Sequence, residues 1–132
     1  MRPYDDAVRD FSATELAHRV LQGRLATGLN ACVECCDRWA DADPAAVALH
    51  WYGAAGQQRS IRFAQLRDDS ARFANHLRSR GIGAGDVVAG LLPRTPDLLT
   101  VVLGTWRAGA VYQPLFTAFG PVWARSRDGI RK

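Results

Sequence analysis

Two short apolar runs flank a longer apolar segment in the second half of the chain. Residues 87–92 and 110–115 are long enough for buried strands and too short for core helices. Residues 95–109 between them predict a helix. This segment begins with Thr-Pro-Asp, which supplies a capping residue, a proline for the first turn and an acid at the positive end of the helix dipole. Because strands joined by a helical crossover lie parallel, residues 87–115 predict a parallel βαβ unit.

The predicted helix of this unit carries apolar side chains on nearly every side. These side chains belong to Leu98, Leu99, Val101, Val102, Leu103 and Trp106. A helix that is apolar almost all round is buried or packed on two sides, so this one needs cover on more than one face. Gly109 suits its end, since glycine readily adopts the conformation that closes helices.

Residues 63–80 show the clearest amphipathic pattern in the chain. One stripe at helical spacing consists of Leu66, Ser70, Phe73, Ala74 and Leu77. The glycines of residues 81–86 follow this predicted helix and precede a strand. A phosphate loop needs its glycines between a strand and the start of a helix, where free N–H groups point at the phosphate. The glycine-rich stretch therefore predicts a helix end and a turn.

The pattern between residues 46 and 63 predicts a β-hairpin. Residues 46–51 form one strand candidate, residues 58–63 the returning strand, and Gly-Ala-Ala-Gly at 53–56 the turn. His50 lies within the first strand. The surrounding apolar residues favour a core or edge position for this histidine over a role as catalytic base.

Two further helices are predicted before the hairpin, over residues 13–25 and 30–40. The second contains Cys32, Cys35 and Cys36, whose i, i+3 and i+4 spacing puts all three on one side. An odd, local set of cysteines is a poor disulfide framework, and the three histidines lack the paired spacing of zinc modules. The cysteines therefore predict a small apolar core face in a reducing compartment, with metal or redox chemistry as the alternative.

The formal charge of +4 belongs mostly to the end of the sequence. Four basic residues stand there against Asp128: Arg125, Arg127, Arg131 and Lys132. The rest of the chain is near neutrality, which argues against a nucleic-acid partner, because such surfaces cluster positive charge. At 132 residues the chain is one domain or part of one. It has no apolar run long enough for a membrane span and no signal-peptide core, so a cytoplasmic location is expected.

The ordered series of these segments carries a family resemblance. The stretch GDVVAGLLPRTPDLLTVVLGTWRAGAVYQPLFTAFGP follows IRFAQLRDDSARFANHLRSRGIGAGD and, earlier, LNACVECCDRWADADPAAVALHW. Together these segments resemble the N-terminal region of AMP-forming acyl-CoA synthetases, in the acetyl- and medium-chain branch of the adenylate-forming ligase superfamily. The resemblance implies an α/β fold, with a partial AMP-binding domain over residues 29–121. Residues 1–28 would be a variable segment, and residues 122–132 a divergent basic tail.

The resembled family activates a carboxylic acid with ATP and Mg²⁺ and passes the acyl group to CoA. By resemblance, Phe116, Thr117 and Ala118 correspond to a segment that lies against the CoA nucleotide. An aromatic face can stack on adenine, and small residues let a ligand approach the backbone. The segment also follows the carboxyl end of a predicted parallel strand, where open α/β sheets bind ligands. The alternative is that Phe116 and Phe119 plug the end of the sheet.

Two parts of the family's chemistry are missing from this sequence. No two Ser or Thr residues are adjacent, so the Ser/Thr/Gly-rich phosphate loop is absent, and the only lysine is Lys132. Without them the site lacks the charge stabilisation on which acyl-adenylate chemistry relies. We therefore expect a truncated, frame-shifted or degenerate product that is inactive alone. It would bind ATP, Mg²⁺ and CoA productively only if a complementing chain supplied the rest.

The alternative is a small non-catalytic α/β module that binds a partner, or a second copy of itself, through an unfinished sheet edge. The first interpretation makes a small-molecule acid and CoA the partners, and the second makes a protein the partner. ATP-dependent thioester formation by the purified chain, measured with and without a lysate of its source, discriminates between them.

Overall fold

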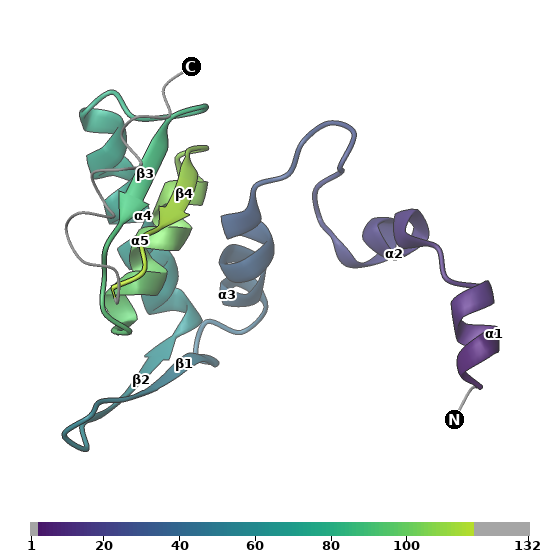
Figure 1. Cartoon of the computed structure of the whole chain (residues 1–132), viewed down its shortest axis with the longest axis horizontal. Helices are drawn as coiled ribbons and strands as arrows, with labels where there is room; N and C mark the ends of the chain where they lie inside the picture. The colour runs from purple at the N-terminus through teal and green to yellow at the C-terminus, as the bar shows by residue number, and fades with distance from the viewer. Residues whose placement is uncertain (1–2, 118–132) are drawn as a thin grey trace.

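The structure is a computed structural model, and it describes residues 3–117. Its elements are α1 (Tyr4–Arg9), α2 (Ala13–Val20), η1 (Val33–Asp37), α3 (Arg38–Ala42), β1 (Val47–Tyr52), β2 (Gln58–Arg62), α4 (Phe63–Ser79), β3 (Val87–Gly90), α5 (Pro96–Arg107) and β4 (Val111–Pro114). Residues 3–29, which include α1 and α2, form an arm that extends away from a body containing the other elements (Figure 1).

The strands β3 and β4 pair in parallel along their whole length, with Val87 opposite Val111. The helix α5 connects them and lies against both. The predicted parallel βαβ unit is therefore confirmed, with strands shorter than the apolar runs. Beyond the end of β3 the chain turns at Pro93, whose carbonyl accepts a hydrogen bond from the Thr95 N–H at 2.8 Å. That turn places Thr95 at the start of α5, although its side chain makes no capping hydrogen bond.

The strands β1 and β2 form the predicted antiparallel hairpin, in which Tyr52 lies opposite Gln58. Gly56 adopts a φ of +82° in the turn, a conformation that glycine adopts without steric cost. His50 is exposed, and its Nδ1 lies 3.0 Å from the Ser60 hydroxyl on the neighbouring strand. This histidine therefore takes a surface position on the hairpin and is not part of the core.

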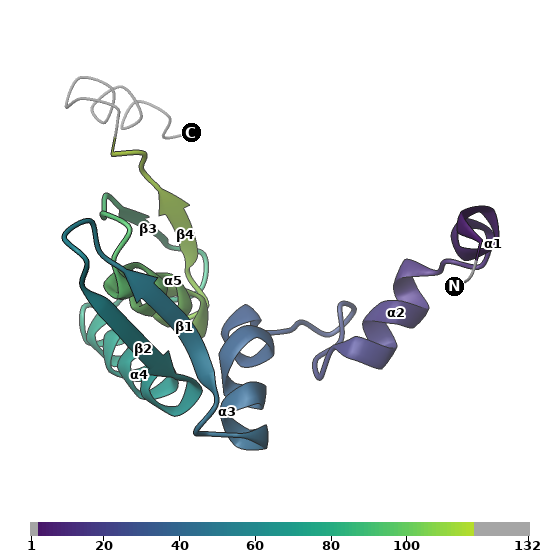
Figure 2. The same cartoon turned by 90° about the horizontal axis from the view of Figure 1, so that it is seen from below.

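The helices α4 and α5 pack against each other beneath the hairpin (Figure 2). Four members of the predicted α4 stripe are buried: Leu66, Ser70, Ala74 and Leu77. A Cβ atom at Gly104 of α5 would lie 2.8 Å from the Ser70 carbonyl oxygen, so the missing side chain permits this close approach. The core cluster consists of Cys32, Cys36, Ile61, Leu66 and Leu103.

The helical segment before the hairpin differs from the prediction. The π-helical turn η1 leads directly into α3. Hydrogen bonds in a π-turn span i→i+5, so each residue advances by a smaller angle than in an α-helix. Cys32 and Cys36 are therefore fully buried, whereas Cys35 is exposed. The prediction that all three cysteines share one buried side was wrong for Cys35.

The predicted helix over residues 13–25 is shorter than expected. The observed α2 begins at a cap in which the Ser12 hydroxyl accepts a hydrogen bond from the Glu15 N–H at 3.3 Å. It ends at Val20, since Leu21 leaves the helical conformation with a ψ of 144°. The short helix α1 was not predicted. Among residues 3–117, no helix is both long and apolar enough to cross a membrane.

Candidate functional site

The carboxyl ends of β3 and β4 lie side by side. The Leu115 N–H donates a hydrogen bond to the Gly90 carbonyl at 2.9 Å, just beyond the end of β4. From here residues 91–95 lead into α5, and residues 115–117 leave β4. Open α/β sheets bind ligands at this edge, outside the carboxyl ends of their parallel strands. We define the candidate site as residues 91–95 and 115–117.

Two of the three predicted site residues lie within the candidate site. Phe116 is 59% exposed, and Thr117 is exposed beside it. Within residues 3–117 the phenyl ring is not buried at the sheet end, so it presents area on which a planar ligand can stack. Ala118 and Phe119 lie outside the described residues.

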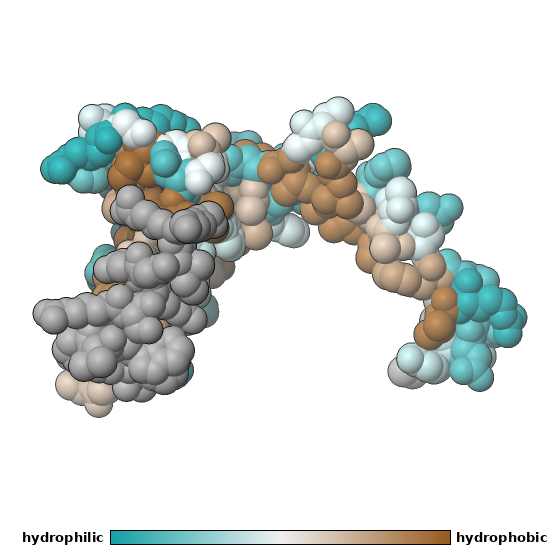
Figure 3. All heavy atoms as spheres, turned by 45° about the horizontal axis from the view of Figure 1, so that its top comes forward, coloured by the Kyte–Doolittle hydropathy of each residue, from teal (hydrophilic) through white to brown (hydrophobic). Residues whose placement is uncertain are grey.

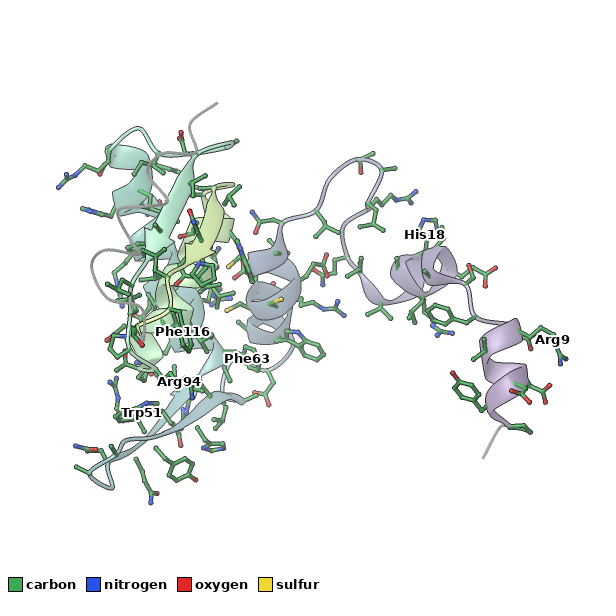
Figure 4. The ribbon with its side chains drawn as sticks, viewed as in Figure 1. Arg9, His18, Trp51, Phe63, Arg94 and Phe116 are labelled. Atoms are coloured by element: carbon green, nitrogen blue, oxygen red, sulfur yellow. The ribbon has the colours of Figure 1, made fainter. Side chains whose placement is uncertain are left out.

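An arginine and a tryptophan that the sequence analysis missed belong to the same region. The Trp51 indole N–H donates to the Arg94 carbonyl at 2.8 Å, which ties the loop after β3 to the β1–β2 hairpin. Arg94 itself is exposed, and Figure 4 shows it on the same side of the body as Phe116. The arginine directly precedes the Thr-Pro-Asp signal of a helix start, which could have identified it. No local signal marks Trp51, because its partner lies 43 residues away.

The start of α5 adds positive potential to this edge. The capping residue Thr95 makes no side-chain hydrogen bond to the first turn, so the turn's N–H groups are not capped by that side chain. The N-terminus of a helix carries a partial positive charge. Together with the guanidinium of Arg94, it favours a negatively charged ligand, with the exposed Asp97 as the opposing charge in the first turn.

Tyr112 packs beside the end of β3. Its hydroxyl is buried and has no hydrogen-bond partner among residues 3–117. A Cβ atom at Gly90 would lie 2.4 Å from that hydroxyl, so the tyrosine occupies the space that a side chain at Gly90 would need. The small residue is therefore required for the ring to lie against the strand.

The candidate site contains one aromatic ring, one guanidinium and two threonine hydroxyls. Its residues include no cysteine, histidine, lysine or carboxylate. Elsewhere in the described part of the chain, no cluster of three or more His, Cys, Asp or Glu residues could hold a metal ion. The arrangement suits recognition of a planar, negatively charged molecule.

The buried cysteines are poor candidates for chemistry. Burial raises the pKa of the Cys36 thiol to about 12. Burial also raises the pKa of the Cys32 thiol, against the opposing effect of the Arg107 charge. Because the thiolate is the nucleophile and metal ligand, thiols held protonated in a core are inert. Cys32 and Cys36 therefore serve as small core residues, as predicted.

A hollow on the body opens at the start of α4. It is lined by Pro44, Ala45, Arg62, Ala64, Gln65, Asp68 and Arg72. The first two N–H groups of α4 are already used there, since the Phe63 N–H donates to the Ala46 carbonyl at 3.0 Å and the Ala64 N–H to the Pro44 carbonyl at 3.4 Å. The hollow shares no residue with the candidate site, and sequence analysis gave no indication of it.

Comparison with known proteins identifies the family. A family model described as AMP-binding enzyme matches residues 36–124. The chain belongs to this family. Within the AMP-binding family, the acetyl-coenzyme A synthetase of Shewanella sediminis (strain HAW-EB3) is 40% identical over 107 residues. That match covers 79% of this chain and 16% of the relative.

Two solved structures of acyl-CoA-forming enzymes show the same fold. The crystal structure of Brucella canis acyl-CoA synthetase is 50% identical, with a TM-score of 0.90, and the match covers 98% of this chain and 23% of that one. The acetoacetyl-CoA synthetase from Streptomyces lividans is 31% identical, with a TM-score of 0.65, over 73% of this chain and 14% of that one. The chain therefore spans less than a quarter of these relatives and corresponds to the N-terminal portion of an AMP-forming acyl-CoA synthetase.

Proposed function

We propose that this chain is the N-terminal segment of an acid–CoA ligase. The complete enzyme would use ATP and Mg²⁺ to activate a small-molecule carboxylic acid and would then pass the acyl group to CoA. The observation that carries the proposal is the likeness to Brucella canis acyl-CoA synthetase, at 50% identity and a TM-score of 0.90 over 98% of this chain. The Shewanella relative, an acetyl-coenzyme A synthetase, favours a short acid as the substrate.

Within that reaction, the role of this segment is to contact the CoA nucleotide through Phe116, Thr117 and Ala118. The exposed phenyl ring of Phe116 supports this role, because an aromatic face stacks on a nucleobase. The guanidinium of Arg94 supports it as well, since arginine binds phosphate groups well.

The chain by itself is not a catalyst under this proposal. The candidate site contains no cysteine, histidine or carboxylate, and the only lysine of the sequence is Lys132. The phosphate-binding loop and the catalytic lysine would be supplied by the remaining polypeptide. That polypeptide accounts for about three quarters of the Brucella canis chain, given that this segment covers 23% of it.

A chimera tests the proposal. In it, this chain replaces the matching segment of Brucella canis acyl-CoA synthetase. We expect the chimera to catalyse acid-dependent pyrophosphate exchange with ATP and to form the CoA thioester, while the isolated chain does neither. Failure of both reactions in a folded chimera, or exchange by the isolated chain above a heat-killed control, contradicts the proposal.

The variant Phe116→Ala in the chimera tests the CoA contact. Base–aromatic stacking contributes about 1–3 kcal/mol, so the KM for CoA should rise by about 5- to 150-fold. Pyrophosphate exchange, which does not involve CoA, should stay unchanged, and Phe116→Tyr should retain the KM. An unchanged KM together with lower thermal stability would instead support the alternative in which Phe116 plugs the sheet end.

One observation favours a second candidate function, a non-catalytic interaction module. Among residues 3–117, the parallel sheet contains β3 and β4 alone, so each strand has an outer edge that no other described strand pairs. Such an edge can accept an added strand from a partner. An inactive but folded chimera, combined with capture of an extended peptide by the isolated chain, would favour this function.

A further inference from the structure

The root of the arm is fixed to the body by a polar clip. The Glu34 carboxylate accepts hydrogen bonds from the Gly23 N–H at 2.7 Å and the Gln22 N–H at 3.1 Å. Arg38 donates to the Val20 carbonyl at 2.6 Å and to the Glu34 carboxylate at 3.1 Å. Two charged side chains of the body therefore hold the backbone at the point where α2 ends.

The two charged side chains of this clip are partly shielded from water. The Glu34 side chain is 8% exposed and the Arg38 side chain 24% exposed. Charge-assisted hydrogen bonds of this kind are shorter and stronger than neutral ones. Because the bonds reach the backbone on both sides of the helix end, they set the direction in which the arm leaves the body.

The arm exposes apolar side chains that the described chain covers only in part. No residue of α2 is buried. The exposed apolar residues are Tyr4, Val8, Phe11, Leu16, Val20 and Leu25. Helices as short as α1 and α2 are marginal in water without tertiary packing. An arm that is fixed at its root and exposes apolar side chains would gain stability by packing them on another surface.

The arm carries hydrophobic side chains along part of its length. Figure 3 shows hydrophobic atoms at the arm's root and along part of the arm. Leu16 and Val20 are four residues apart, so they share one side of α2. Thr14 and His18 share a different side in the same way, and Figure 4 shows Arg9 directed away from the body.

The comparison with Brucella canis acyl-CoA synthetase indicates the occupant of this surface. That structure matches 98% of this chain with a TM-score of 0.90, so the match includes the arm as well as the body. This segment is 23% of that chain, which leaves about three quarters of a synthetase available to cover the arm. We propose that the arm is a docking element, and that its residues Leu16 and Val20 pack against the remaining polypeptide of the synthetase. The inference rests on the proposed function, since it takes its partner from it.

Co-expression tests the inference. This chain, carrying an affinity tag, is co-expressed with a Brucella canis acyl-CoA synthetase polypeptide from which the matching segment has been deleted. Leu16→Glu with Val20→Glu places two charges on the apolar side of α2, and Thr14→Glu with His18→Glu places two at the same spacing on the other side. All four positions are exposed, so both variants should keep the circular dichroism and thermal unfolding of the body.

We expect the first variant to lower recovery of the deleted synthetase by about tenfold or more, and the second to leave recovery within about twofold of wild type. Equal recovery with both variants would overturn the docking role and leave the proposed function standing, because the chimera measures catalysis separately. Failure of the wild-type chain to recover the deleted synthetase would also overturn it. A homodimer of this chain that Leu16→Glu with Val20→Glu dissociates would assign the arm to a second copy and overturn the inference.

Discussion

Arg107 of α5 and Asp37 of η1 form a bidentate ion pair between residues that lie 70 positions apart in the chain. The Arg107 Nη1 donates to Asp37 Oδ2 at 2.8 Å, and Nη2 donates to Asp37 Oδ1 and to the Ser70 hydroxyl. Each side chain of the pair keeps only 18% exposure. Because Ser70 belongs to α4, the pair joins η1, α4 and α5 beside the fully buried Cys32.

We predict that Asp37→Ala destabilises the chain by about 3 kcal/mol. Removing one partner of a largely buried ion pair leaves the other charge uncompensated, which costs about 3–5 kcal/mol. The residual exposure of Arg107 puts the expected loss at the lower end of that range. Urea unfolding followed by tryptophan fluorescence measures the change.

The matched control is Asp41→Ala, which removes a different carboxylate partner of an arginine. Asp41 accepts a hydrogen bond from Arg67 at 2.9 Å, but its side chain is 74% exposed. Exposed pairs of this kind contribute about 0–1 kcal/mol. Equal losses from Asp37→Ala and Asp41→Ala would contradict the structural role assigned to the Arg107–Asp37 pair.

The elements that sequence analysis predicted are those whose signals are local. The hairpin has its turn glycines between its strands, and residues 63–80 show a helical stripe that matches the buried side of α4. The βαβ unit follows from two apolar runs around a helix with a clear start signal. In each case, neighbouring residues determine the type of the element, and for α4 they also determine the side that is buried.

The features that were missed depend on contacts between distant residues. The spacing of Cys32, Cys35 and Cys36 predicts a shared side only if the helix is regular, and the π-turn η1 breaks that condition. Likewise, nothing near Arg107 in the sequence identifies Asp37 as its partner. At the candidate site, Phe116 and Thr117 were predicted through the family resemblance and stay a prediction, whereas the contact between Trp51 and Arg94 required the folded chain.

The second prediction concerns the cysteines. In the folded chain at pH 8, Cys35 alone should react readily with a thiol reagent, because it is exposed while Cys32 and Cys36 are fully buried. Burial also raises the pKa of Cys36 to about 12, which keeps the reactive thiolate scarce. Titration with Ellman's reagent should count one fast thiol in buffer and three in denaturant. The variant Cys35→Ser should remove the fast phase; a fast phase that persists in that variant would contradict the assigned burial.

The third prediction concerns the contact between α4 and α5. Gly104→Ala would place a Cβ atom 2.8 Å from both the Ser70 carbonyl oxygen and the Phe73 ring. Overpacking costs about 1–3 kcal/mol, and alanine returns about 1 kcal/mol of helix propensity. We therefore expect the free energy of unfolding to fall by about 1 kcal/mol, because the backbone of α4 cannot move aside as a side chain could.

At the control position Gly83, an added Cβ meets no atom closer than 4.0 Å, so Gly83→Ala should stay within about 0.5 kcal/mol of wild type in the same unfolding assay. A gain in stability from Gly104→Ala would show that the two helices are less tightly packed than described.

The last prediction concerns the clip at the root of the arm. The hydrogen bonds that Glu34 accepts from the Gly23 and Gln22 N–H groups, with a smaller contribution from Arg38, hold the pKa of its carboxyl below the ordinary value of 4.5. A carboxyl whose pKa is lowered in the folded protein stabilises the fold at pH values above its ordinary pKa. This stabilisation is lost as the pH falls through the lowered pKa. The hydrogen bonds to Glu34 should therefore persist at neutral pH and weaken only below pH 4.5. The NMR chemical shift of the Gly23 amide proton should report this change, with a titration midpoint below pH 4.5.

Glu34→Gln should abolish the titration of the Gly23 amide proton, while the Gly56 amide, which donates to the Gly53 carbonyl, should not titrate in either protein. A Gly23 midpoint at or above 4.5 would mean that the carboxylate does not hold the arm.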